Sequence, residues 1–249
     1  MLVPSCNLKA IFFDLDDTLC NYSEAAMGGR RDSFELIRQI KPELTIDFIY
    51  EVYWTIFQEM VTEVRKPGTW RERYLKCGAS SRDETMTRTV KVLGIDDEQL
   101  GERVSSLYDI HRRKRLRLYP DVLLALKLLH DHYFLGIITN GPADVQRDEL
   151  ATLQINEFFS SVFIEGEFGL GKPDPKIFLA ALEAADANPE EAIFIGDSRT
   201  HDIAGAKMVG INTIWINREG VPSPEDQIKP DLEIKNLQEL VDWLRIPCV

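Results

Sequence analysis

Short runs of apolar residues that alternate with helical patterns are the feature that most constrains how this chain can fold. These runs are rich in β-branched and aromatic residues, and they lie at Ala10–Phe13, Leu135–Thr139, Ser161–Ile164, Ala192–Ile195 and Thr213–Ile216. Helical periodicity separates the last four of them, at Ala143–Leu153, Pro175–Ala185 and Ile203–Val209. Apolar runs of this length predict buried strands, and strands that alternate with helices predict a doubly wound parallel α/β sheet.

One long interval interrupts the alternation. The chain between Asp17 and Leu135 is far longer than the about a dozen residues that a parallel crossover needs, and it has helical periodicity. Two sequences in it resemble capping boxes and predict helix starts, namely Ser81 with Glu84 and Asp96 with Gln99. We therefore predict a Rossmann-like core made of residues 1–20 and 118–249, with an all-helical domain inserted at residues 21–117.

The chain is acidic. Its 29 Lys and Arg against 41 Asp and Glu, in 249 residues, give a net charge of −12. A field of this sign repels phosphate backbones and anionic lipids, so we expect a small-molecule substrate and neither a nucleic-acid nor a membrane partner. The basic run His111–Arg117 is interpreted as solvated charge at the end of a helix. The oligomeric state stays open.

The cysteines and the N-terminal residues bear on the compartment. Cys6, Cys20, Cys77 and Cys248 have no spacing typical of a zinc site or a disulfide framework, and we expect reduced thiols. The first residues lack the apolar region of a secretory signal peptide, and no stretch is long and apolar enough for a membrane span. These observations predict a cytoplasmic protein.

Polar residues that could take part in catalysis or bind a metal follow the predicted strands. Ligands of doubly wound sheets bind beyond the carboxyl ends of the strands, so these residues are expected to meet at one edge of the sheet. In chain order they are Asp14, Asp16, Thr139, Asn140, Lys172, Asp197 and Asp202. Four carboxylates facing a single lysine would repel one another without a cation, and oxygen ligands are those that Mg²⁺ prefers. The sequence therefore predicts a Mg²⁺ site.

The order and spacing of these residues resemble a known family. The segments Asp14-x-Asp16-x-Thr18, Thr139-Asn140, Lys172-Pro173 and Gly196-Asp197-Ser198-x-x-x-Asp202 are similar to the four motifs of the haloacid dehalogenase superfamily. The predicted helical insert resembles the C1 cap of that superfamily. The segment Thr213–Asn217, together with I-T-N-G, is similar to the N-acylneuraminate-9-phosphatase and pyrimidine 5′-nucleotidase branches, although His201 stands where this branch often has Asn.

The resemblance implies a phosphatase that works through an aspartyl-phosphate and uses Mg²⁺. Asp14 would be the nucleophile, and Asp16 would protonate the leaving oxygen and then deprotonate water. The metal ligands would be Asp14, the backbone carbonyl of Asp16, and Asp197, with Asp202 in support.

The resemblance also implies contacts to the transferred group. Thr18, Thr139 and Asn140 would contact the phosphoryl oxygens, and Lys172 would offset the charge between the phosphate and the nucleophile. Substrate selectivity would come from the insert. There, Arg71 and Arg73 follow a chain reversal and are expected to bind the substrate beyond its phosphate, or else to be solvated at a helix start.

We therefore predict a Mg²⁺-dependent phosphomonoester hydrolase for a small metabolite such as a sugar phosphate or a nucleoside monophosphate. Hydrolytic dehalogenation of 2-haloacids and phosphosugar mutation are alternatives on the same fold. Asp16 and a full metal site argue against dehalogenation, because an alkyl halide leaves without protonation and needs no metal. A binding module without activity is the remaining alternative, and the filled motif positions disfavour it.

Overall fold

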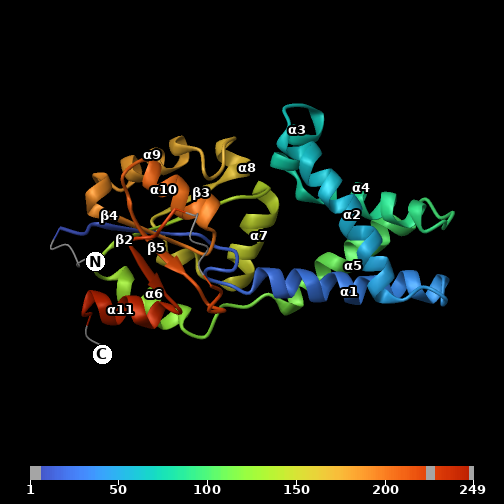
Figure 1. The fold of residues 1–249 in the computed structure, drawn as a ribbon, viewed down its shortest axis with the longest axis horizontal. Helices are drawn as coiled ribbons and strands as arrows, with labels where there is room; N and C mark the ends of the chain where they lie inside the picture. Colours follow the sequence, from blue (N-terminus) through green and yellow to red (C-terminus); the bar gives the residue numbers. More distant parts are fainter. Residues whose placement is uncertain (1–6, 223–227, 247–249) are drawn as a thin grey trace. The chain divides into compact units, whose positions relative to one another are not determined.

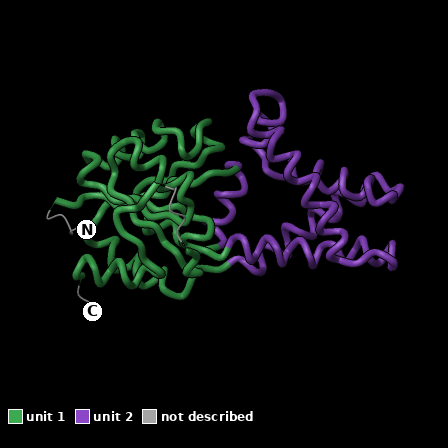
Figure 2. The backbone as a smooth tube through the Cα atoms, in the orientation of Figure 1, with its two compact units in different colours: residues 1–21, 117–141, 153–249 green, residues 22–116, 142–152 purple. Residues whose placement is uncertain are grey.

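The computed structural model of the protein describes residues 7–222 and 228–246. These residues form helices and the strands of one sheet, as Figure 1 shows. The chain forms two compact units, one made of residues 1–21, 117–141 and 153–249 and the other of residues 22–116 and 142–152 (Figure 2). The first contains the sheet and is called the sheet unit here, and the second is called the helical unit.

Over the described residues the sheet has six strands, all parallel, in the order β3-β2-β1-β4-β5-β6. Their bounds are β1 (Ala10–Phe13), β2 (Phe134–Thr139), β3 (Ser161–Ile164), β4 (Ala192–Gly196), β5 (Asn212–Ile216) and β6 (Leu232–Ile234). This topology confirms the predicted doubly wound α/β fold. The sequence did not predict β6, because a strand of three residues is too short to show periodicity.

The position of β1 determines where a site can form. Phe13 at its end pairs with Ile137 of β2 and with Ile195 of β4. The strand order changes direction between β1 and β4, and ligands of open α/β sheets bind beyond the strands at such a switch point. The residues directly after β1 and β4 therefore lie at the expected binding edge.

Helices cover both faces of the sheet. Figure 1 shows α9 (Pro175–Ala184) and α10 (Ala204–Met208) on one face, and α6 (Val122–His130) and α11 (Leu237–Leu244) on the other. Phe178 of α9 packs on Phe194 and on the cluster around Phe12. The remaining short helices of this unit are α8 (Glu165–Phe168), η1 (Asn156–Phe158), η2 (Pro189–Glu191) and η3 (Arg199–Ile203).

The helical unit contains α1 (Tyr22–Ile40), α2 (Ile46–Arg65), α3 (Thr69–Lys76), α4 (Gly78–Val92), α5 (Leu100–Arg115) and α7 (Ala143–Leu153). Its apolar core includes Phe34, Tyr53, Met86 and Val104. An apolar core that draws on most of these helices is what an all-helical unit needs, because each amphipathic helix must bury one face.

The two predicted capping boxes are wrong. Ser81 lies inside α4, whose first N–H, that of Gly78, donates to Asp144 Oδ1 of α7 at 2.9 Å. The start of α5 is capped by Asp97, whose carboxylate accepts from the N–H groups of Gln99 and Leu100. In the first case a partner distant in sequence supplies the capping oxygen, and a local pattern cannot reveal such a partner.

The boundary residues of the predicted insert lie against each other. The N–H of Asn21 donates to the carbonyl of Arg117 at 3.1 Å, and the N–H of Arg117 donates to Asn21 Oδ1 at 2.9 Å. The helical unit takes up residues 22–116 and also α7, which lies between β2 and β3 in the chain. The inserted domain at 21–117, as a cap, stays a prediction.

Two further sequence expectations concern thiols and membrane spans. Cys20 is buried and Cys77 exposed, both as free thiols, whereas Cys6 and Cys248 lie outside the described residues. Within residues 7–222 and 228–246, no helix has the length and apolarity that a membrane crossing requires.

Candidate active site

Asp14 follows β1 directly and is the centre of the candidate site. Its N–H donates to the carbonyl of Ile195 at 2.9 Å, which extends the β1–β4 pairing by one residue. Its carboxylate is nearly buried and accepts two hydrogen bonds, from Lys172 Nζ to Oδ1 at 2.5 Å and from Thr18 Oγ1 to Oδ2 at 3.2 Å. Asp14 is therefore held in one orientation at the end of the central strand.

Thr18 reaches Asp14 because the chain turns back after β1. Asp17 has a φ of 59°, a left-handed conformation that Asp tolerates better than most residues. The turn at this residue brings Thr18 back toward Asp14. The hydroxyl of Thr18 donates to Asp14 and accepts from the N–H of Asp197 at 3.1 Å. The side chain of Thr18 thus connects the residues that follow β1 and β4.

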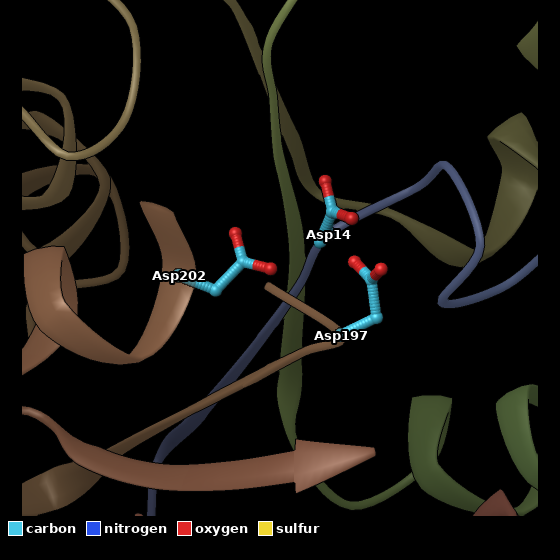
Figure 3. A group of neighbouring side chains, drawn as sticks. All are labelled: Asp14, Asp197 and Asp202. Carbon is cyan, nitrogen blue, oxygen red and sulfur yellow. The ribbon is translucent and has the colours of Figure 1, made fainter. Parts of the chain in front are cut away.

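Three carboxylates meet at this edge of the sheet. Oxygen atoms of Asp14, Asp197 and Asp202 lie within 4.8 Å of one another, and Figure 3 shows the three side chains converging. Gly196 makes the approach of Asp202 possible, since a Cβ at this position would lie 2.2 Å from Asp202 Oδ2. The glycine at the end of β4 is therefore part of the site.

Lys172 lies among these acids. Its Nζ is 2.5 Å from Asp14 Oδ1 and 2.7 Å from Asp202 Oδ1, and the residue is buried. Burial alone would lower the pKa of Lys172, but the charges of Asp14 and Asp202 outweigh it and hold that pKa above its ordinary value. Asp14 and Asp202 therefore favour the protonated form of Lys172.

One lysine does not balance three acids. Burial, and next the charges of Asp14 and Asp202, raise the pKa of Asp197 to about 8. Burial, with the charge of Asp14, raises the pKa of Asp202 to about 6, although Lys172 opposes this shift. A cation bound among these acids would offset the repulsion that raises their pKa values. The acids offer only oxygen ligands, which suit the hard ion Mg²⁺. The residues present therefore fit a divalent cation.

Asp16 does not join this carboxylate group, although the sequence predicted that four acids would converge. β1 ends at Phe13, so the alternating side-chain directions of a strand do not continue to Asp16, which forms an isolated bridge with Cys20. Cys20 Sγ lies 3.9 Å from Asp16 Oδ1. Asp16 is half-buried, so its carboxylate keeps some access to solvent.

Asn140 and Thr139 lie at the end of β2. The amide of Asn140 bonds twice to the backbone of Lys172, donating to its carbonyl at 2.8 Å and accepting from its N–H at 2.7 Å. Gly171 leaves room for this contact, because a Cβ there would lie 2.6 Å from Asn140 Oδ1. The amide of Asn140 thus orients the Lys172 loop. The contact of Asn140 with the phosphoryl oxygens, which the resemblance implies, stays a prediction.

Sequence reasoning missed several side chains that support the site. Buried Glu165 accepts the N–H of Gly141 at 3.1 Å and so braces the turn after β2. Trp215 donates from its indole N–H to the carbonyl of Asp197 at 2.7 Å. The N–H of Ser198 donates to Asp202 Oδ2 at 2.9 Å. Glu165 directly follows β3, and this position at a strand end is the sequence signal that could have identified it.

His201 contacts the residues of its own motif. Its ring Nδ1 lies 3.0 Å from Ser198 Oγ, and the same oxygen accepts the backbone N–H of His201 at 3.2 Å. Ser198 therefore caps the turn η3, which carries Asp202. The histidine that departs from the resemblance thus contacts the cap of this turn.

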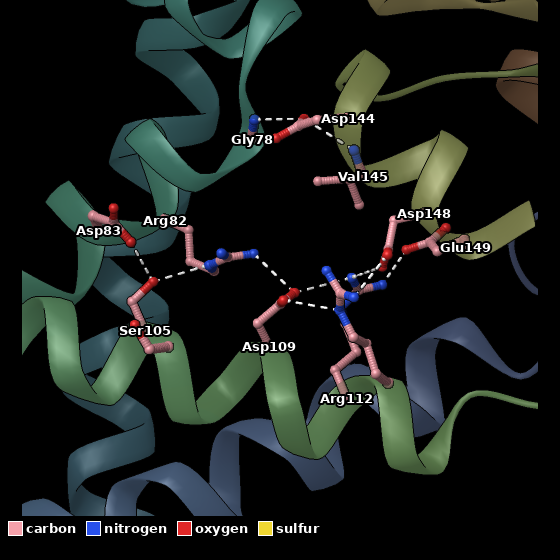
Figure 4. A network of polar contacts seen from close by, with 12 residues as sticks. Gly78, Arg82, Asp83, Ser105, Asp109, Arg112, Asp144, Val145, Asp148 and Glu149 are labelled. Atoms are coloured by element: carbon pink, nitrogen blue, oxygen red, sulfur yellow. Dashed lines mark hydrogen bonds and ion pairs between the residues drawn. The ribbon is translucent and has the colours of Figure 1, made fainter. Parts of the chain in front are cut away.

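Other residues that the sequence singled out lie in the helical unit. Arg71 and Arg73 belong to α3, and the guanidinium of Arg73 is 5.4 Å from the ring centroid of Trp70. Their role in selectivity stays a prediction. The basic run was interpreted as solvated, and this is wrong for Arg112, which is 1% exposed and pairs with Glu149 of α7 (Figure 4).

Comparisons with known proteins agree with this geometry. The family model of the haloacid dehalogenase-like hydrolases matches residues 11–216. The glyceraldehyde 3-phosphate phosphatase of Methanopyrus kandleri is 33% identical over 244 residues, which cover 96% of this chain and 97% of the relative. The N-acylneuraminate-9-phosphatase of Rattus norvegicus is 25% identical over 244 residues, covering 94% of this chain and 95% of the relative.

Solved structures give the same result. A 2-haloacid dehalogenase from Pseudomonas syringae aligns with a TM-score of 0.68 and 28% identity, over 96% of this chain and 98% of that one. A putative HAD-hydrolase, YfnB, from Bacillus subtilis, solved with bound magnesium, aligns with a TM-score of 0.72 and 25% identity, over 96% of this chain and 100% of that one. Because the family model spans the four motifs and relatives match along nearly the whole length, the chain belongs to the haloacid dehalogenase-like hydrolase family.

Proposed function

We propose that this protein is a Mg²⁺-dependent phosphomonoester hydrolase for a small phosphorylated metabolite. The observation that supports this most directly is the group of three carboxylates, Asp14, Asp197 and Asp202, with Lys172 between two of them. Its oxygen-rich donor set suits a divalent ion, which phosphoryl transfer uses to offset developing charge. The curated relatives described above are phosphatases of small metabolites, which also supports the proposal.

In the proposed reaction, a carboxylate oxygen of Asp14 attacks the phosphorus atom. The new O–P bond forms as the bond to the leaving oxygen breaks, and Asp16 gives its proton to that oxygen. The aspartyl-phosphate is then hydrolysed by a water molecule, whose proton returns to Asp16, and inorganic phosphate leaves. The hydrogen bonds from Lys172 and Thr18 keep the Asp14 carboxylate in place for the attack.

Asp14, the backbone carbonyl of Asp16, Asp197 and Asp202 would hold the Mg²⁺. When bound, the ion would offset the negative charge of the phosphoryl group and of the acids around it. The chain itself contributes the positive charge of Lys172. We also propose that Thr139 and the turn after β2 contact the phosphoryl oxygens. The amide of Asn140 orients Lys172 through its two backbone hydrogen bonds.

Dehalogenation is the second candidate, because a 2-haloacid dehalogenase is among the structurally similar proteins. Carbon–halogen cleavage by a carboxylate needs neither a metal nor a proton for the departing halide. The three-acid group would then be an electrostatic cost without a function. This argument favours the phosphatase.

The decisive experiment measures phosphate release from a panel of substrates. The panel contains triose phosphates, phosphoserine, hexose phosphates, nucleoside monophosphates and N-acylneuraminate 9-phosphate, each with Mg²⁺ and with EDTA. We expect Mg²⁺-dependent release from at least one of them, and loss of turnover in Asp14→Asn, whose amide is a poor nucleophile. Release that persists within about tenfold in Asp14→Asn would refute the role of this residue.

A second arm of the same experiment tests dehalogenation. Chloride release from 2-chloropropionate is measured with and without EDTA. Chloride release that EDTA leaves unchanged, without phosphate release from any panel member, would establish the alternative and refute the proposal.

Selectivity is proposed to come from the helical unit acting as a cap, with Arg71 and Arg73 as the candidate contacts to the substrate. Their alanine variants are compared on the best panel substrate and on p-nitrophenyl phosphate. Loss of one charge-assisted hydrogen bond would lower kcat/KM for the metabolite by about 1.5–3 kcal/mol and spare the small surrogate. Wild-type behaviour of both variants on both compounds would exclude these arginines.

A further inference from the structure

Arg218, just after β5, contacts the turn that follows the proposed nucleophile. Its Nη2 donates to the carbonyl of Thr18 at 2.8 Å, and its Nε donates to the same oxygen at 3.1 Å. None of the four motifs includes Arg218, and it lies 200 residues from Thr18 in the chain. The contact therefore depends entirely on the tertiary fold.

The guanidinium of Arg218 is itself fixed in place. Asp121 accepts from Nη1 at 3.0 Å and from Nη2 at 3.2 Å, and the ring centroid of Tyr119 lies 3.9 Å from the guanidinium carbon. Asp121 is fixed in turn, since its Oδ2 accepts the N–H of Leu237 at the start of α11 at 2.7 Å. The side chain of Arg218 is 13% exposed. A planar guanidinium with its donors fixed on two partners is a rigid support.

Thr18 links this support to the site. Its carbonyl accepts from Arg218, and its hydroxyl contacts the Asp14 carboxylate and the N–H of Asp197. A shift of the Thr18 backbone would move this hydroxyl away from both residues at once. Misplacement by about 1 Å can cost about 100-fold in rate, so a modest movement would be measurable.

We propose that Arg218 is a positioning residue for the reaction. It holds the Thr18 carbonyl so that the Thr18 hydroxyl keeps its hydrogen bonds with Asp14 and Asp197. This inference rests on the proposed function. Arg218 touches neither the substrate nor the reacting atoms in this proposal. Its effect on the rate passes through Thr18, which distinguishes it from a residue that only stabilises the fold.

The first test compares Arg218→Ala with Lys207→Ala, using p-nitrophenyl phosphate at a temperature well below both melting points. Lys207→Ala removes the ion pair with Asp231 in the same unit and leaves the contacts of Arg218 intact, so it is the matched control for stability. We expect kcat of Arg218→Ala to fall about 10- to 100-fold with little change in KM, and that of Lys207→Ala to stay within about twofold. Equal kcat losses in the two variants would overturn the proposal.

The second test is a double-mutant cycle with Thr18→Val, which removes the hydroxyl and keeps the shape. If Arg218 acts through Thr18, its replacement by alanine costs little in kcat once that hydroxyl is gone. Additive losses would overturn the proposal.

Arg218→Lys keeps one donor for the carbonyl and covers the case in which Arg218→Ala does not fold. We expect the kcat of Arg218→Lys to fall by less than that of Arg218→Ala. If only the lysine variant folds, we expect its kcat to be about 2- to 10-fold below that of the wild type. A lysine variant with wild-type kcat but a lowered melting temperature would show a purely structural role and overturn the proposal. A wild type without any Mg²⁺-dependent turnover would refute the proposed function itself, whereas wild-type turnover with unchanged kcat in the variants refutes this inference alone.

Discussion

At the residue scale, the candidate site depends on a position without a side chain as much as on its charged groups. Gly196 ends β4, and any Cβ on it would overlap the carboxylate of Asp202. Asp202 is 1% exposed and is bound by Lys172 and by the N–H of Ser198, so moving it aside would break both contacts. The glycine thus permits the close approach of an acid to the strand end.

We therefore expect Gly196→Ala to displace Asp202 and to lower kcat/KM for phosphate release by at least about tenfold. Gly94→Ala is the control, because Gly94 has a φ of 69° in the helical unit, so its replacement costs stability without touching the site. Steady-state kinetics and thermal unfolding are measured for both variants. Retained activity in Gly196→Ala would mean that Asp202 tolerates displacement.

At the element scale, α5 and α7 are joined by a buried ion pair. Arg112 of α5 donates to Glu149 of α7 and also contacts Asp109 at 3.2 Å, and the side chains of Arg112 and Glu149 are 2% and 0% exposed (Figure 4). Removal of one partner from a buried pair leaves a charge without compensation.

Each of Arg112→Met and Glu149→Leu is expected to lower the free energy of unfolding by about 3–5 kcal/mol. The double variant should lose less than the sum of the two, because it leaves no unpaired charge. Arg113→Ala is the matched control, because Arg113 is 49% exposed and pairs with Asp109 and Asp148. We expect it to lower the free energy of unfolding by less than about 1 kcal/mol. Urea unfolding of the four variants measures this, and a loss in Arg112→Met as small as in Arg113→Ala would contradict the expectation.

The pairing of β5 with β6 includes an acid whose protonation is linked to stability. Asp231 accepts from Lys207 Nζ at 2.7 Å and from the N–H and hydroxyl of Thr213 at 2.9 and 2.8 Å. Burial by itself would raise the pKa of Asp231, but these hydrogen bonds outweigh it and hold the pKa below its ordinary value. A depressed pKa in the folded state stabilises the protein above the unfolded pKa of about 3.9, and the contribution is lost as the pH falls through the folded pKa.

We expect the difference in melting temperature between the wild type and Asp231→Asn to be constant near neutral pH and to shrink below about pH 4. Thermal unfolding between pH 7 and pH 3 measures it. A difference that does not change over this range would show that Asp231 is not linked to folding through its charge.

At the scale of the whole molecule, the units do not follow the order of the chain. α7 comes directly after the turn that contains Asn140 and Gly141, yet it belongs to the helical unit. Its ties to that unit include the Arg112–Glu149 pair, the Arg113–Asp148 pair and the hydrogen bond from Gly78 to Asp144. The segment after the proposed phosphate-binding turn is therefore stabilised by residues of α4 and α5.

Native-state hydrogen exchange tests this assignment. Amides of α7 should share their opening free energy and denaturant dependence with α1 and α5, because cooperative units exchange together. Arg112→Met should then speed exchange in α7 more than in β1 and β2. Exchange of α7 together with the sheet, unaffected by Arg112→Met, would assign α7 to the sheet unit.

Much of the site followed from the sequence because its chemistry sits at strand ends. Asp14, Lys172, Asp197 and Asp202 were predicted from their positions after apolar runs, and the structure brings these four together. The carboxylate of Asp16 was expected in the same group and lies outside it, because strand geometry stops at Phe13. Extrapolation of a local pattern beyond its element was the source of this error.

The sequence alone determined the first five strands, the doubly wound class and the family, since periodicity and motif spacing are local properties of the chain. Only the tertiary structure decided that the Asn140 amide orients Lys172, that Arg112 is buried, that α7 joins the helical unit and that Arg218 supports Thr18. Each of these depends on a hydrogen bond, ion pair or contact between residues far apart in sequence. Such partners leave no periodic signal, because the free energy that pairs them arises only after the fold has brought them together.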